Sequence, residues 1–262
     1  MRVLFIGDVY GSPGREMVEL HLHKLKQEYR PQVIIANGEN SAHGKGITSK
    51  IYRRFLELGI NVITMGNHTF DNREIYEFIE DAKYLVRPGN MYKNAPGKDY
   101  VIYQCNQTKI AVVNLQGKTF MQTYSCPFAK IDELLPEIQK QADIIFVDFH
   151  AETTSEKIAM SWYLDGRVAA VVGTHTHVQT NDGRILPKGT AHLSDVGMTG
   201  PRDGIIGVTR ETILERFTTG MSDRFTVATG PRQLSYAVID IDDKTGKATK
   251  IQWQIIAEDI KL

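Results

Sequence analysis

The chain has 262 residues, of which 42% are hydrophobic and 24% are charged, the composition of an ordinary globular protein. Its 31 basic and 31 acidic residues give a formal net charge of +0, which argues against a broad electrostatic attraction to nucleic acid or to an anionic membrane. The sequence shows no apolar run of membrane-spanning length and no signal-peptide pattern, and its two cysteines are too few for a disulfide framework. We therefore expect a cytoplasmic protein with no membrane partner.

The first half of the chain alternates buried strands with helices. Runs that are apolar throughout, rather than alternating, are typical of strands covered on both faces. Between these runs, apolar residues recur at helical spacing. The pattern predicts strands over residues 3–9, 33–39 and 61–67 and helices over residues 15–29, 51–58 and 72–82, with Gly59 ending the second helix.

The second half begins with a hairpin and becomes rich in strands toward its end. The hairpin is expected to pair residues 100–105 with 109–115 through a turn at 106–108. The remaining segments are helices over 128–141 and 153–164, strands over 143–149 and 168–173, and strand-like segments at 225–230, 234–242 and 248–256. The whole pattern predicts an α/β protein with a layered fold, in which central β-sheets are flanked by helices and followed by a β-rich C-terminal segment. With no linker or repeat evident, residues 1–262 are predicted to form a single domain.

Most of the predicted buried strands end in polar residues that can bind a metal ion. In open α/β sheets ligands bind at the carboxyl ends of the strands, so residues far apart in the sequence meet there. Considered alone, Asp8 could cap a helix, Asn67 could stabilise a turn and His150 could be a hydrogen-bonded core histidine. Glu39 is harder to explain in this way, because a buried carboxylate must be paired or metal-bound. Together the strand-end residues predict a metal site: Asp8, Glu39, Asn40, Asn67, His68, His150, His175 and His177.

The types of ligand indicate the kind of metal and the chemistry. Carboxylate, amide and imidazole groups without a thiolate suit Fe, Mn or Zn. The ligands are too many for one tetrahedral ion, but a carboxylate that bridges two ions accommodates them all. Two neighbouring metal ions stabilise the attacking and leaving oxygens in a displacement at phosphorus. The sequence therefore favours hydrolysis of a phosphoester.

Several short motifs carry a family likeness. They are GDVYGSPGR, NGENSAHGKG, TMGNHTFD, DFHAE, GTHTHVQT and DVGMTGP. These motifs resemble those of the calcineurin-like metallophosphoesterases and, over nearly the whole chain, those of the YmdB-like bacterial phosphodiesterases within that superfamily. The resemblance implies a metallophosphoesterase-type fold, two divalent or mixed-valence metal ions with iron as the native metal, and 2′,3′- or 3′,5′-cyclic nucleotides as substrates.

The resemblance also implies a role for each candidate ligand. Glu39 would bridge the two metal ions. The remaining ligands divide into Asp8, Asn40 and His177 at one ion and Asn67, His150 and His175 at the other. His68 would be the catalytic residue: as a hypothesis, a metal-bridging hydroxide attacks phosphorus while His68 protonates the leaving oxygen. Alternatively, His68 could be an additional metal ligand, or it could contact the ligands without binding the metal.

The chain departs from the wider superfamily at three positions. The usual Asp-x-His reads Asp8-Val9-Tyr10, so Asn40 is expected to replace the missing histidine. The usual Gly-Asp reads Gly38-Glu39, and the residue after Gly-Asn-His is Thr69 instead of an acid. Asp71 is a candidate for orienting His68 in place of that acid.

Other functions stay open at this stage. A non-enzymatic regulator that binds a nucleotide or a protein through the same fold is the main alternative, and a two-metal hydrolase of a non-phosphate substrate such as an amide is a third. RNA is a further candidate partner, because a local groove could bind it despite the neutral net charge, and a homo-oligomer is also compatible with the sequence. Arg15, His43 and Lys45 are weaker candidates for substrate contacts, and each could equally be an ordinary surface or loop residue.

Overall fold

The strands form two sheets in the computed structural model, which describes residues 1–122, 124–221 and 224–258. The strand order of the first sheet is β11 (Gly200–Pro201), β12 (Arg232–Ile241), β1 (Arg2–Ile6), β2 (Val33–Asn37), β3 (Val62–Thr64) and β4 (Leu85–Val86), with β13 (Ala248–Ala257) paired to β12. Strands β1 to β4 run parallel to one another, and β12, from the end of the chain, is antiparallel to β1.

The second sheet has a parallel centre and antiparallel edges. Its strand order is β5 (Tyr100–Cys105), β6 (Thr108–Gln116), β7 (Ile144–His150), β8 (Ala170–Thr174), β10 (Ala191–Leu193) and β9 (Arg184–Ile185). The four central strands run parallel to one another, and the edge strands β5 and β9 pair antiparallel with their neighbours.

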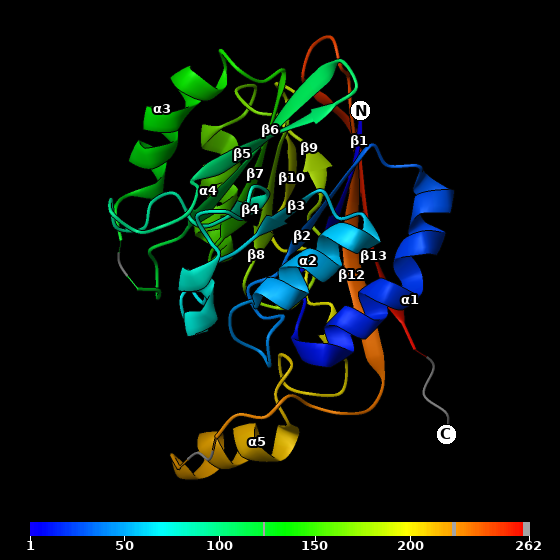
Figure 1. Ribbon diagram of the computed structural model, residues 1–262, viewed down its shortest axis with the longest axis vertical. Helices are drawn as coiled ribbons and strands as arrows, with labels where there is room; N and C mark the ends of the chain where they lie inside the picture. Colours follow the sequence, from blue (N-terminus) through cyan, green and yellow to red (C-terminus); the bar gives the residue numbers. More distant parts are fainter. Residues whose placement is uncertain (123, 222–223, 259–262) are drawn as a thin grey trace.

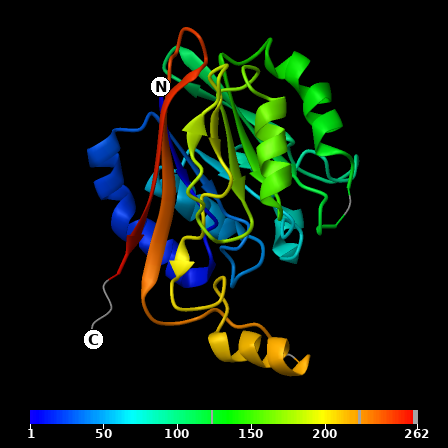
Figure 2. The ribbon, with the colours of Figure 1, turned by 180° about the vertical axis from the view of Figure 1, so that it is seen from behind.

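The sheets pack face to face and helices cover their outer faces. Between the sheets, the ring of Phe5 stacks on that of Phe146 with centroids 5.6 Å apart, inside a shared apolar core. Helices α1 (Gly11–Tyr29) and α2 (Ser49–Leu58) pack on the first sheet, and α3 (Pro127–Ile138) and α4 (Thr154–Tyr163) pack on the second. Figures 1 and 2 show α1 and α3 on opposite sides of the paired sheets. This arrangement confirms the predicted layered α/β fold and its β-rich C-terminal segment.

The helix predicted over residues 72–82 is wrong. The segment contains a short 3₁₀ helix, η1 (Arg73–Glu77), followed by turns. Phe78 ends it with φ −138° and ψ −10°, outside the helical region. Aromatic and β-branched residues, here Ile75, Tyr76, Phe78 and Ile79, have weak helix propensity, and the apolar spacing alone did not compensate for it.

Other parts of the prediction also differ from the structure. The strands predicted over residues 3–9, 33–39 and 61–67 end earlier, β1 at Ile6, β2 at Asn37 and β3 at Thr64. Helix α1 begins at Gly11 instead of residue 15, because Pro13 is tolerated in the first turn of a helix. The strand-like segment 225–230 forms no strand but an isolated bridge between Val227 and Val208, and it follows an unpredicted helix, α5 (Arg210–Thr219). The sequence did not predict α5 because a single buried residue, Ile213, does not form the apolar stripe by which an amphipathic helix is recognised. Both ribbon views show α5 set apart from the paired sheets (Figures 1 and 2).

No helix in the described part of the chain is both long enough and apolar enough to cross a membrane.

Candidate metal centre

The predicted ligands lie in loops at the carboxyl ends of strands from both sheets. Asp8 follows β1, and Glu39 and Asn40 follow β2. From the other sheet, His150 is the last residue of β7, and β8 ends directly before His175. Because the sheets face each other, these edges meet, and all seven side chains belong to one cluster: Asp8, Glu39, Asn40, Asn67, His150, His175 and His177.

One part of the cluster surrounds His177. Its Nε2 atom lies 3.1 Å from Nδ2 of Asn40 and 3.9 Å from Oδ1 of Asp8. The Asn40 amide also lies 3.2 Å from Oε1 of Glu39. Rotation of this amide by 180° would place its oxygen where the nitrogen is, facing the same partners. Asp8 and Asn40 thus both lie close to the same ring nitrogen of His177.

The other part surrounds His150. Its Nε2 atom lies 2.9 Å from Oδ1 of Asn67, 3.1 Å from Nδ1 of His175 and 3.0 Å from Oε1 of Glu39. The ligand atoms of Glu39, His150 and His175 all lie within 4.8 Å of one another, close enough to bind a single metal ion. Glu39 contacts both parts of the cluster, as a bridging carboxylate requires.

The buried polar atoms of the cluster fit a cation. Asp8 is fully buried, and its Oδ1 atom has no hydrogen-bond partner among the described residues. A buried carboxylate oxygen without a partner is costly unless a positive charge compensates it. The donor set of carboxylate, amide and imidazole groups suits a first-row metal ion.

The pKa values of the cluster show the same need for positive charge. Burial by itself would raise the pKa of Glu39, but His150 more than offsets this and holds that pKa well below its usual range. Burial would lower the pKa of His150, yet Glu39 raises it to about 9. The pKa of Asp8 is raised well above its ordinary value by burial, and that of His175 is lowered to about 3 by burial and by its neighbour His150. His150 thus supplies the charge that a metal ion would supply.

Each cluster histidine is fixed through its second ring nitrogen. Nδ1 of His150 lies 2.9 Å from the Thr174 hydroxyl, which donates to Asp148 at 2.7 Å. Nε2 of His175 lies 3.1 Å from Oε2 of Glu152, and Nδ1 of His177 lies 2.8 Å from the Ile206 carbonyl. Oxygen acceptors behind metal-bound histidines typically fix the ring orientation and tautomer.

The backbone of the loop after β8, which carries His175 and His177, is strained and is held by hydrogen bonds to buried groups. His175 and His177 have φ values of 101° and 65°, which residues other than glycine seldom adopt outside functional sites. Thr176 between them donates its backbone N–H and its hydroxyl to Asp195, at 3.1 and 2.7 Å. Asp195 is in turn paired with Lys157 at 2.6 Å, and both side chains are buried.

Replacing Lys157 with methionine is expected to lower the free energy of unfolding by about 3–5 kcal/mol, because it leaves the Asp195 charge buried without its partner. Urea denaturation of the metal-free protein measures the change. Lys140→Met is the matched control, since Lys140 is an exposed lysine paired with Glu137, and should alter stability little. A Lys157→Met protein as stable as the control would show that the buried pair does not stabilise the loop.

The Gly-Asn-His motif is shaped by close packing against the cluster. A Cβ atom on Gly66 would lie 2.3 Å from Oε2 of Glu39 and 2.4 Å from Nε2 of His150. No side chain larger than glycine fits at this position. The glycine therefore allows the loop that carries Asn67 and His68 to approach the two ligands.

His68 lies beside the cluster and is oriented by an acid. Its backbone N–H donates to Oε2 of Glu39 at 3.0 Å, and its Nδ1 lies 2.8 Å from Oδ2 of Asp71. Asp71, considered a candidate for this role, thus contacts the ring of His68. Lys45 lies 3.7 Å from the same carboxylate, and Arg15 donates to the Ser41 carbonyl in the neighbouring loop.

Several supporting residues were not anticipated from the sequence: Asp148, Glu152, Lys157, Thr174 and Asp195. The sequence could have indicated Asp148 and Glu152, because each lies two positions from the ligand His150 in the Asp-Phe-His-Ala-Glu motif. Lys157 and Asp195 are 38 positions apart, and nothing local in the sequence links them.

Comparisons with known proteins find matches over almost the whole chain. The family model described as "YmdB-like protein" matches residues 4–253. A Bacillus subtilis protein named 2′,3′-cyclic-nucleotide 2′-phosphodiesterase is 58% identical over 259 residues, which cover 99% of this chain and 98% of the relative. A solved Thermus thermophilus structure, described as a hypothetical protein, superposes with a TM-score of 0.93 at 41% identity and covers 99% of this chain and 100% of its own. A structure described as a novel phosphatase, from Mycoplasma pneumoniae, has a TM-score of 0.94 at 37% identity, with coverage of 100% and 95%.

Proposed function

Because the chain belongs to the YmdB-like family, we propose that it is a metal-dependent phosphodiesterase that hydrolyses 2′,3′-cyclic nucleotides. The observation that carries this proposal is the clustering of the six other candidate ligands around Glu39, with the His68–Asp71 pair beside them. The name of the Bacillus subtilis relative supplies the substrate class.

The candidate ligands would hold two metal ions around Glu39. Asp8, Asn40 and His177 would serve one ion, and Asn67, His150 and His175 the other, in keeping with the two groups of contacts. When bound, the ions would stabilise negative charge on the phosphoryl oxygens and acidify a water molecule. We propose iron as the native metal, with manganese or zinc as alternatives that the same donors accept.

His68 is proposed as the general acid. Its Nδ1–H donates to Asp71, so Nε2 is the atom that can give a proton to the leaving oxygen. In the reaction, the oxygen of a water molecule bonds to phosphorus while the bond between phosphorus and O2′ breaks. His68 gives its proton to O2′, and the proton released by the water restores the protonated imidazole through solvent. The product is a nucleoside 3′-phosphate. In a 3′,5′-cyclic phosphate, which we propose as a second class of substrate, the bond that breaks would be the one between phosphorus and O3′, and the product would be a nucleoside 5′-phosphate.

Removal of metal is expected to abolish hydrolysis of 2′,3′-cyclic AMP, because Asp8, Glu39 and the histidines alone provide no strong Lewis acid. Anaerobic return of Fe²⁺ or Mn²⁺ should restore the formation of adenosine 3′-phosphate. Chromatography of the products and elemental analysis of the protein measure activity and metal content together, and 3′,5′-cyclic AMP serves as the comparison substrate. Full activity in stripped protein would refute the metal requirement. Failure to cleave either nucleotide with two metal ions bound would refute the proposed reaction.

A further inference from the structure

A cavity of about 670 Å³ lies directly beside the metal centre. Tyr10 forms part of its wall, and the Tyr10 ring meets the His177 ring edge-on, with centroids 5.5 Å apart. Asp71, which contacts His68, is another part of the wall. A ligand in this cavity would therefore adjoin both a proposed metal ligand and the proposed general acid.

The cavity is strongly basic, although the chain as a whole has no net charge. Its lining contains Lys45, Arg73, Arg216 and Arg224 against one carboxylate, Asp71. Among the described residues, Lys45 forms an ion pair with Asp71 at 3.7 Å, and the three arginines form none. The guanidinium of Arg216 lies 5.4 Å from the ring centroid of Phe225, so a flat cation and an aromatic ring stand together in the wall.

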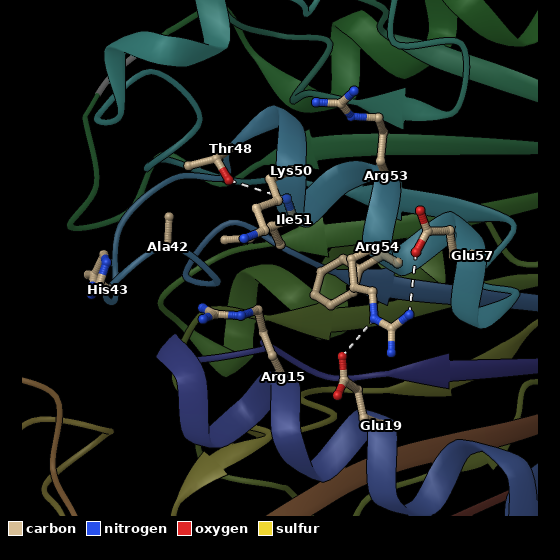
Figure 3. Close-up of a pocket in the computed structure, with 11 residues that line it drawn as sticks. Arg15, Glu19, Ala42, His43, Thr48, Lys50, Ile51, Arg53, Arg54 and Glu57 are labelled. Carbon is tan, nitrogen blue, oxygen red and sulfur yellow. Dashed lines mark hydrogen bonds and ion pairs between the residues drawn. The ribbon is translucent and has the colours of Figure 1, made fainter.

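A second cavity of about 610 Å³ adjoins the first. The two share Ala42 and His43. Figure 3 shows this second cavity between α1 and α2, with Arg15 on α1 and Lys50 and Arg53 on α2.

The charges of this second cavity are also unbalanced. Arg54 is held by Glu19 and Glu57, at 2.8 and 3.3 Å (Figure 3). Arg15, Lys50 and Arg53 remain without an acidic partner among the described residues. The two cavities adjoin each other at Ala42 and His43. The cations that line them are here called the basic track: Lys45, Arg73, Arg216 and Arg224 in the first cavity and Arg15, Lys50 and Arg53 in the second.

A cyclic mononucleotide does not account for the basic track. Its single phosphate would be taken by the metal centre, which leaves the cations of both cavities unused. Grooves for single-stranded nucleic acid combine backbone-binding cations with an aromatic side chain on which a base stacks. A 2′,3′-cyclic phosphate also forms naturally at the 3′ end of an RNA strand, because the terminal ribose has the required 2′-hydroxyl.

We propose, building on the proposed phosphodiesterase activity, that the preferred substrate is an RNA strand ending in a 2′,3′-cyclic phosphate. The terminal phosphate lies at the metal centre, and the preceding phosphates lie along the basic track. Phe225 and Arg216 provide the surface on which a base stacks. RNA fits better than DNA, because deoxyribose cannot form the cyclic end.

The test compares an adenosine tetranucleotide that ends in a 2′,3′-cyclic phosphate with 2′,3′-cyclic AMP, using the metal-loaded enzyme. The ratio of the two kcat/KM values should favour the tetranucleotide in the wild type and fall by about tenfold in Arg216→Ala, because a charge-assisted contact to phosphate is lost. Lys50→Ala tests the second cavity in the same way. Arg210→Ala is the matched control, since Arg210 also lies on α5 but lines a different cavity with Asp203 and Glu211, and it should leave the ratio unchanged.

The dependence of kcat/KM on salt concentration is an independent test of the basic track. With two or three phosphates bound, a fourfold rise in salt should lower kcat/KM for the tetranucleotide by about tenfold more than for 2′,3′-cyclic AMP. A wild-type enzyme that cleaves both substrates equally well, or a ratio that Arg216→Ala leaves unchanged, would overturn the basic track. If metal-loaded protein cleaves neither substrate, the phosphodiesterase proposal fails. Binding of RNA to the basic track is then measured separately, by fluorescence anisotropy of a labelled tetranucleotide. Binding that Arg216→Ala weakens supports the basic track, and the absence of binding overturns it.

Discussion

Replacing Glu39 with glutamine is expected to remove both metal ions and to lower kcat/KM for 2′,3′-cyclic AMP by about a thousandfold or more. Glu39 is buried and contacts both parts of the cluster, through Asn40 at 3.2 Å and His150 at 3.0 Å. Glutamine keeps the shape of the side chain but removes the charge, so the loss would reflect the missing carboxylate. Metal stabilisation of a phosphoryl transition state is worth several kcal/mol, which corresponds to a factor of this size.

Glu152→Gln is the control for this experiment. Glu152 is also a carboxylate near the cluster, but it contacts His175 from outside, at 3.1 Å, and its side chain is 47% exposed. Its replacement should weaken metal binding by about tenfold and leave both sites able to fill. Metal content by elemental analysis and kcat/KM are measured on both variants. Two bound metal ions in Glu39→Gln would exclude a bridging role for this residue.

The placement of the candidate ligands could be predicted from sequence because of one topological regularity. Asp8, Glu39 and His150 are far apart along the chain, but each follows or ends a strand that is parallel within its sheet. Parallel strands present their carboxyl ends at a common edge, so convergence within each sheet follows from the order of the strands. The packing of the two sheets face to face then brings the two edges together. The prediction did not need accurate boundaries: β1 ends at Ile6, two residues before Asp8.

The supporting contacts could not be predicted in this way, because they depend on the packing of segments without a shared pattern. The pairing of Lys157 with Asp195 joins a residue of α4 to a loop after β10. Asp195 opens the DVGMTGP motif, but nothing in the sequence marks Lys157 as its partner, since a lysine in a helix is normally exposed. The basic track could not be predicted for the same reason. Arg216 belongs to α5, whose weak apolar pattern concealed the helix, and only the folded chain brings it beside Lys45.

Replacing His68 with alanine is expected to retain both metal ions and to lower kcat for 2′,3′-cyclic AMP by about 10²–10⁴-fold, the usual contribution of general acid catalysis. Metal binding should survive, because the contact of His68 with Glu39 is made by the backbone N–H at 3.0 Å, which alanine keeps. The lost group is the imidazole, whose side chain is 28% exposed and therefore accessible to a substrate. Elemental analysis and steady-state kinetics measure the two effects.

A substrate whose leaving group departs without a proton separates acid catalysis from any other role of His68. A nitrophenyl phosphodiester has such a leaving group, so His68→Ala should slow its hydrolysis far less than that of 2′,3′-cyclic AMP. Equal losses on both substrates would instead assign His68 to binding phosphate or to holding the metal centre. Asp71→Asn should show the same dependence on the leaving group with a smaller loss, because Asp71 acts on the leaving oxygen through the ring that it orients at 2.8 Å. The two variants together therefore test proton donation from His68 to O2′ and the orientation of the His68 ring by Asp71.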